Sequence, residues 1–99
     1  MDKTLESHLE STENQHELLA ALLFTAKNDW EAAHFIAQKK EGVLDYDRIH
    51  ALLHRIEGDE FNAKYWYRRI NEVYGKYTVA EEWAFLTKEF IEKYAKKAT

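Results

Sequence analysis

The chain has 99 residues, of which 45% are hydrophobic and 14% aromatic, and a formal net charge of -4, which suits one small domain with a packed core. It has no cysteine, no proline and three glycines, which excludes disulfides, thiolate catalysis and cysteine zinc sites and disfavours a turn-rich β fold. Residues 1–49 hold five Lys/Arg against ten Asp/Glu and residues 50–99 hold nine against eight, so neither half offers the basic surface that nucleic-acid binding requires.

The first ten residues are polar apart from Leu5 and Leu9, and they either fray or form a short helix. The spacing of the apolar residues would also allow one helix to continue through this segment. Ser11 and Thr12, however, offer a new N-cap. We therefore predict the first main helix over residues 12–27.

Each later helix has a polar cap at its start and a loop glycine near its end. A glycine can adopt the left-handed conformation that ends a helix, and Asn28 with Glu31 and Thr78 with Glu81 have the spacing of a capping box. The predicted helices span about 28–40, 45–57, 59–74 and 78–97, with caps at Asn28, Asp45, Asp59 and Thr78 and stops at Gly42, Gly58 and Gly75.

A shift of 31 residues aligns the first half of the chain with the second. Under this shift Ala20 falls on Ala51, Ala32 on Ala63, and Phe35 on Trp66. One helical hairpin cannot bury its apolar faces alone, so the two must stack. The sequence predicts an all-α fold in a single domain over 1–99. Two stacked antiparallel hairpins form repeat 1 (about 12–42) and repeat 2 (about 45–75), and a C-terminal capping helix seals the second hairpin.

The second hairpin resembles a known repeat. Its Asp, Ala and Trp-Tyr-Arg-Arg residues match the second helix of a Sel1-like repeat, a relative of the tetratricopeptide repeat; the matching residues are Asp59, Ala63, Trp66, Tyr67, Arg68 and Arg69. Leu19-Ala20 and His50-Ala51 replace the expected Leu-Gly pair, and the usual proline is absent. The run from Gly58 to Asn71 is also similar to uncharacterised bacterial proteins. The resemblance implies a stacked helical fold that binds proteins, with no enzymatic activity and no cofactor.

The predicted 45–57 helix carries Asp47, His50 and His54 on the face opposite its apolar residues. Two histidines one helical turn apart can share a metal ion, and a carboxylate can complete the ligand set. His34 is a further candidate ligand. The alternative is a solvated polar face of an amphipathic helix, because His-x3-His also occurs without a metal.

The predicted 59–74 helix carries a second candidate site, formed by Phe61, Tyr65, Arg68 and Arg69. Aromatic and arginine side chains are favoured anchors of protein interfaces. The alternative is that these side chains pack inside the fold, because a middle helix of a stack has two buried faces.

The predicted 12–27 helix is apolar nearly all round, and its second face carries Leu19 and Leu23. Such a face needs a cover. Either Leu5 and Leu9 fold back over it or a second copy of the chain covers it, which makes a homodimer through Leu19 and Leu23 possible.

Catalytic arrangements are scarce in the sequence, and no glycine-rich phosphate-binding loop is present. The start lacks an apolar signal segment, and the longest apolar run, Leu18 to Phe24, is far below the ~20 residues that cross a bilayer. We therefore expect a cytoplasmic, non-enzymatic module for protein interaction or self-association, with no membrane or nucleic-acid partner. A helical bundle that binds a metal or small ligand through Asp47, His50 and His54 is the alternative.

Overall fold

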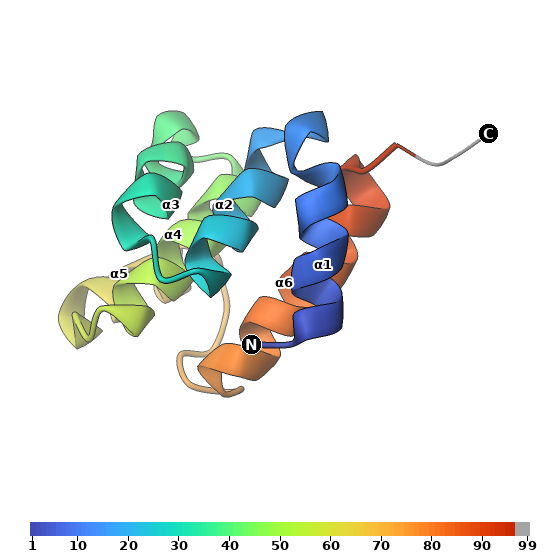
Figure 1. The fold of residues 1–99 in the computed structure, drawn as a ribbon. Coiled ribbons are helices and arrows are strands. Elements are labelled where there is room, and N and C mark those ends of the chain that lie inside the picture. The colour runs from blue at the N-terminus through green and yellow to red at the C-terminus, as the bar shows by residue number, and fades with distance from the viewer. Residues whose placement is uncertain (97–99) are drawn as a thin grey trace.

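The computed structural model describes residues 1–96, and every secondary-structure element in this part of the chain is a helix or a 3-10 turn (Figure 1). The predicted all-α class is confirmed at that level. In chain order the elements are α1 (Lys3–Thr12), η1 (Glu13–Gln15), α2 (Glu17–Ala26), α3 (Trp30–Ala37), η2 (Gln38–Lys40), α4 (Leu44–Ile56), α5 (Glu60–Arg69) and α6 (Val79–Tyr94), where η marks a 3-10 turn.

Two of the four caps predicted for the later helices act as the sequence predicts. Asp59 caps α5 by accepting the backbone N–H of Asn62, and Thr78 with Glu81 forms the predicted capping box of α6. The cap predicted at Asp45 is absent, because α4 already begins at Leu44 and the Asp45 carboxylate accepts from Lys93 and Tyr94 of α6 instead. The cap predicted at Asn28 is displaced by one residue. Asp29 caps α3, whereas Asn28 takes the left-handed conformation with φ 61°. An asparagine tolerates that conformation better than most residues.

Two helix ends differ from the prediction. The helix predicted over 59–74 stops at Arg69, because Asn71 adopts φ 59° and breaks the ladder of backbone hydrogen bonds. Val73, inside the predicted helix, therefore lies in the loop after α5 and is 69% exposed. The 3-10 turn after Ala37 likewise shortens the helix that was expected to reach Lys40.

Corresponding turns of the two helix pairs lie 30 residues apart, and not 31. Asp29 N–H donates to the carbonyl of Phe24 and Asp59 N–H to that of His54, so the same turn recurs 30 residues on. Burial follows this register: the buried pairs are Leu22 with Leu52, Leu23 with Leu53, Ala21 with Ala51 and Ala33 with Ala63. The register predicted from residue similarity is wrong by one.

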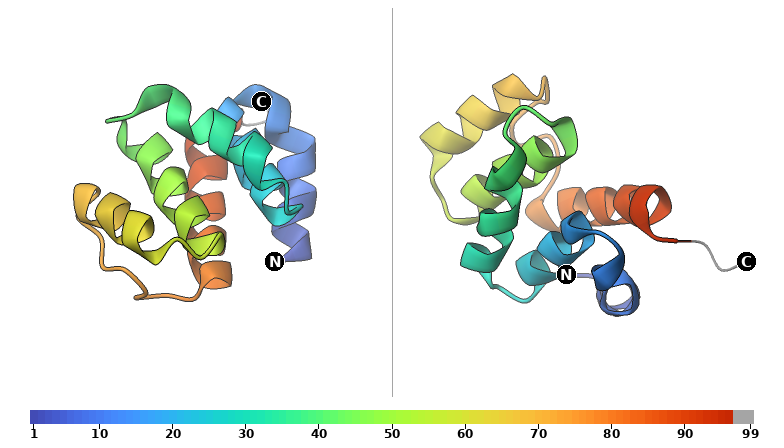
Figure 2. Two further views of the ribbon diagram at one scale, coloured as in Figure 1. Left: turned by 90° about the vertical axis from the view of Figure 1, so that its left-hand side faces the viewer. Right: turned by 90° about the horizontal axis from the view of Figure 1, so that it is seen from above.

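The helices α2 and α3 pack together, as do α4 and α5, and α3 joins the two pairs by packing on α4. The last helix does more than seal the second hairpin. Besides α4 of that hairpin, α6 packs on α2 of the first hairpin and on α1, along one side of the bundle (Figures 1 and 2). Its apolar stripe explains this position, since Trp83, Leu86 and Phe90 are all buried in the main core.

The N-terminal segment is an ordered helix and covers α2. Asp2 caps α1 through the N–H groups of Thr4 and Leu5, and the Leu9 side chain of α1 is fully buried. Leu19 is 0% and Leu23 3% exposed, because α1 and α6 both pack on α2. The expectation that Leu19 and Leu23 form an exposed self-association face is therefore wrong, and the chain itself provides the cover.

Candidate metal centre

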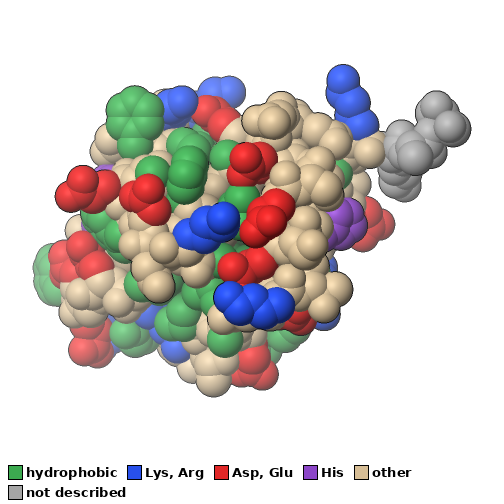
Figure 3. All heavy atoms as spheres, in the orientation of Figure 1, with side chains coloured by type: hydrophobic (Ala, Val, Ile, Leu, Met, Phe, Trp, Pro, Cys, Tyr) green, Lys and Arg blue, Asp and Glu red, His purple; other side chains and the backbone are tan. Residues whose placement is uncertain are grey.

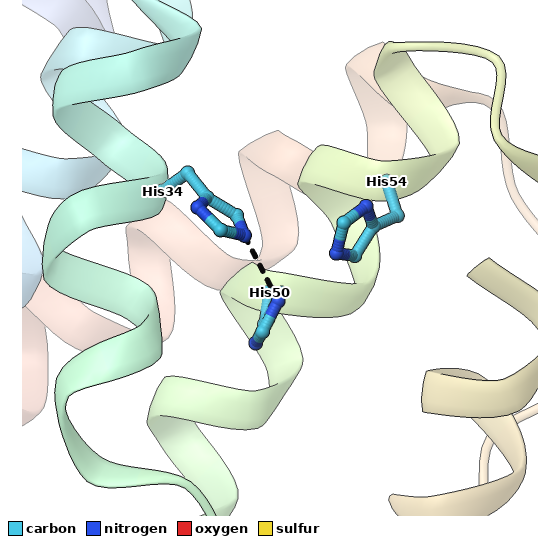
Figure 4. A group of neighbouring side chains, drawn as sticks. All are labelled: His34, His50 and His54. Atoms are coloured by element: carbon cyan, nitrogen blue, oxygen red, sulfur yellow. Dashed lines mark hydrogen bonds between the residues drawn. The ribbon is translucent and has the colours of Figure 1, made fainter. Parts of the chain in front are cut away.

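Three histidines from two helices meet between the hairpins. His50 and His54 lie one turn apart on α4, so their side chains share a face, and α3 packs alongside and brings His34 to them. Each offers a ring nitrogen, and these three nitrogens lie within 4.8 Å of one another. Figure 4 shows the rings of His34 and His50 in contact and His54 turned toward the same space. We call these residues the histidine cluster.

The shortest approach in the histidine cluster joins the Nε2 atoms of His34 and His50, which lie 3.1 Å apart. Two nitrogens bound to one tetrahedral zinc at about 2.0–2.1 Å each are separated by about 3.3 Å. The pair is therefore already spaced as two ligands of one ion would be. The third nitrogen, from His54, lies within 4.8 Å of both.

Two tryptophans form the walls of the histidine cluster. Trp30 stacks on His34 with ring centroids 4.5 Å apart, and Trp66 of α5 stacks on His50 at 4.1 Å. The indole N–H of Trp30 donates to the carbonyl of Leu53 at 2.7 Å, which fixes that wall. His50 and His54 are each only 7% exposed. The alternative of a solvated polar face is therefore wrong, because α5 covers this side of α4.

A carboxylate orients His54. Its Nδ1–H donates to Glu57 Oε1 at 2.7 Å, which leaves the lone pair of Nε2 free. Histidines that bind metals usually donate their other ring N–H to a carboxylate or a carbonyl in this way. The side chain of Asn62 lies beside the same ring, with its Nδ2 3.4 Å from His54 Nε2.

Burial favours the neutral form of two of the histidines. Burial first, and then the positive charges that His54 and His34 can carry, together lower the pKa of His50 to about 4. Burial also lowers the pKa of His34, with the neighbouring His54 as the next cause. A neutral imidazole is the form that binds a metal. His50 Nδ1 is buried and has no hydrogen-bond partner within residues 1–96, a rare state for a buried polar atom.

Asp47, which the sequence groups with the two α4 histidines, does not join them. Its carboxylate accepts the backbone N–H of Gly42 at 3.1 and 3.2 Å and so closes the loop before α4. The predicted ligand set is wrong at Asp47, because a free backbone donor lies nearer to it than the histidines do. His34 takes its place in the cluster. The sequence signal for His34 is weaker, since its approach depends on how α3 packs against α4.

The second predicted site lies on the outer side of α5. Phe61 is 85% and Tyr65 39% exposed, and Arg68 and Arg69 are also exposed. Arg69 donates to Glu41 at 2.7 Å and its guanidinium lies 4.8 Å from the centre of the Trp66 ring. Internal packing of Phe61, the alternative from sequence, is therefore wrong. These four residues are here called the α5 surface.

A separate cavity of about 200 Å³ lies between the loop after α5 and α6, lined by residues that include Tyr67, Val73, Tyr77 and Phe85. Its half-buried carboxylate, Glu82, already accepts hydrogen bonds from Tyr67 and Arg55. Burial raises the pKa of Glu82 against the opposing effect of these two partners. This carboxylate is thus engaged within the chain, and the histidine cluster is the stronger candidate site.

Comparison with known proteins gives no match to a family model, to a curated protein or to a solved structure. The resemblance to tetratricopeptide and Sel1-like repeats therefore stays a prediction. No helix among the described residues combines the length and the hydropathy that crossing a bilayer requires.

Proposed function

We propose that this protein binds a divalent transition-metal ion through His34, His50 and His54. The observation that carries the proposal is the convergence of three imidazoles, with two Nε2 atoms 3.1 Å apart. The lowered pKa of His50 and of His34 and the Glu57 carboxylate behind His54 support it.

The donor set narrows the class of metal. Imidazole nitrogen suits zinc, copper, nickel and iron, whereas magnesium and calcium take oxygen ligands. The chain contains no cysteine, so it lacks the thiolates that zinc-finger and iron–sulfur sites use. A bound ion would tie α3 to α4 and thereby the first hairpin to the second.

Metal binding is tested with untagged, metal-free protein titrated with zinc in a calorimeter. We expect one ion per chain. At a free zinc concentration 100 times the dissociation constant, the free energy of unfolding should rise by about 2.7 kcal/mol. His34→Ala should abolish this gain, because the half-buried His34 is the ligand whose loss disturbs the core least.

The matched control is His8→Ala, since His8 is exposed on α1 and lies outside the histidine cluster. This variant should bind zinc like the unchanged protein. Zinc binding that survives His34→Ala unchanged, or an unchanged protein that gains no stability from zinc, copper, nickel or iron, would show that the proposal is wrong.

A second candidate function is protein binding in the cytoplasm by a tetratricopeptide-like pair of hairpins. The 30-residue recurrence of the same turn supports such a pair. The α5 surface supports the binding role. Phe61 is 85% exposed beside Tyr65 and two arginines, and a partner that removed this ring from water would gain binding free energy. Hydrophobic side chains are also more numerous on the α3 and α5 side of the face in Figure 3 than on the α1 side.

If the α5 surface binds a protein, the double variant Phe61→Ala, Tyr65→Ala should lose binding to that partner and keep its folded structure. The free energy of unfolding should change by less than about 1 kcal/mol, as is usual for surface positions. Paired pull-downs with the unchanged protein and with Phe85→Ala, another exposed aromatic, serve as comparison. A larger loss of stability, or the same captured proteins from all three baits, argues against the α5 surface.

A further inference from the structure

We propose that a metal ion in the histidine cluster keeps one coordination position for a small exogenous anion, and that the Asn62 side-chain amide donates a hydrogen bond to it. This inference rests on the proposed metal binding and assigns to it the class of ligand that the bound ion takes. Such a site needs three features. The fold must supply only three metal ligands, the charge of the ion must favour an anion, and a hydrogen-bond donor must lie beside the open coordination position.

The first requirement concerns the fourth ligand. Within residues 1–96, no carboxylate joins the group formed by the three histidines. Glu57 is held at the Nδ1 side of His54, away from the converging nitrogens, and Asp47 is bonded to Gly42. The walls are the rings of Trp30 and Trp66, and indole is not a ligand. Zinc held by three protein ligands takes water or another molecule in the fourth position.

The second requirement concerns charge. Three neutral imidazoles leave the 2+ charge of the ion without compensation. The site is also shielded from solvent, because the side chains of His50 and His54 are each only 7% exposed. An unbalanced charge in a buried site is costly. Binding an anion at the open position lowers that cost, and the half-buried His34 marks the side of the cluster nearest to solvent.

The third requirement is met by Asn62, which lies in the first turn of α5. Its Nδ2 is 3.4 Å from His54 Nε2, the atom through which His54 would hold the metal, and 3.5 Å from Nδ1 of the same ring. The backbone of Asn62 is fixed, because its N–H donates to the capping Asp59 at 3.2 Å. The amide therefore stands at the edge of the coordination sphere with two N–H donors.

The test uses cobalt as the metal and azide as the anion, because the visible absorption of Co²⁺ reports its coordination. We expect azide to change the spectrum of the cobalt-loaded chain in a saturable way. Asn62→Leu, which keeps the approximate size of the side chain and removes both donors, should weaken azide binding by about tenfold and leave cobalt affinity unchanged. Asn14→Leu, at an exposed asparagine in η1, is the control and should behave like the unchanged protein.

The remaining outcomes separate this inference from the metal site itself. If cobalt binds and azide leaves the spectrum unchanged, the open position is absent and the inference is wrong, while metal binding stands. If Asn62→Leu weakens cobalt binding, Asn62 is a ligand that fills the fourth position, and the inference again fails. If azide binds equally well to Asn62→Leu, the role given to Asn62 is wrong. If the unchanged protein binds no cobalt, the proposed function fails first.

Discussion

Replacing Trp83 by alanine is expected to lower the free energy of unfolding by about 3–5 kcal/mol, the usual cost of removing a large buried aromatic side chain. Trp83 is 0% exposed and lies in the main core. Its indole N–H donates to the carbonyl of Leu22 at 2.9 Å and so joins α6 to α2. A domain of this size has a total stability of roughly 5–15 kcal/mol, so the variant should be close to unfolding.

Urea unfolding followed by circular dichroism measures this loss. Trp83→Phe should cost less, about 1–3 kcal/mol, because the ring is partly retained while the hydrogen bond is lost. Phe85→Ala, two residues further along α6 and 46% exposed, is the control, and we expect a cost below about 1 kcal/mol. Equal losses for Trp83→Ala and Phe85→Ala would contradict the packing of the Trp83 face of α6 into the main core.

The second large effect is a loss of stability in acid, caused by His50 in the metal-free protein. Burial lowers the pKa of His50 to about 4 in the folded chain, against the ordinary 6.5 of a histidine in the unfolded chain, so the unfolded chain binds more protons between these two values. Stability therefore rises with pH across this window and is lost as pH falls from about 6.5 toward 4. The shift corresponds to about 3 kcal/mol, at 1.36 kcal/mol for each pH unit.

Thermal or urea unfolding at several pH values in the presence of a chelator would measure this slope. The His50→Gln variant has no titrating group at position 50, and its free energy of unfolding should fall less steeply between pH 6.5 and 4. The half-buried His34 contributes in the same direction, since its pKa is also lowered, so part of the slope should remain. Identical slopes for the two proteins would mean that His50 is not the neutral buried base described above.

Helix starts could be predicted from the sequence because they depend on nearby residues. The cap at Asp59 and the capping box of Thr78 with Glu81 each need only three or four residues. The register of the repeat could not be read from residue similarity. A 31-residue shift matches Phe35 to Trp66. The backbone turns lie 30 residues apart, so Ile36 is the position equivalent to Trp66, and both are buried. The position of α6 escaped prediction for a related reason, since an apolar stripe does not say which helix it will cover.

The candidate site could be predicted in part, for the same physical reasons. His50 and His54 share a face of one helix, and helical spacing alone shows that. His34 reaches them only because α3 packs on α4, and Trp66 covers them only because α5 folds back. Helical spacing places Asp47 on the same face of α4 as His50 and His54. A backbone N–H in the preceding loop competes for its carboxylate, and periodicity does not reveal such a donor.

One helix, α5, connects the two candidate sites. It packs mainly on α4, and Trp66 and Asn62 face the histidine cluster while Phe61 and Tyr65 face outward. A ligand that fixes His50 also restrains Trp66, and with it the local opening of α5, which amide hydrogen exchange would report. If both sites bind, thermodynamic linkage makes the coupling reciprocal: a partner that requires an ordered α5 strengthens metal binding by the same factor by which the metal strengthens the partner.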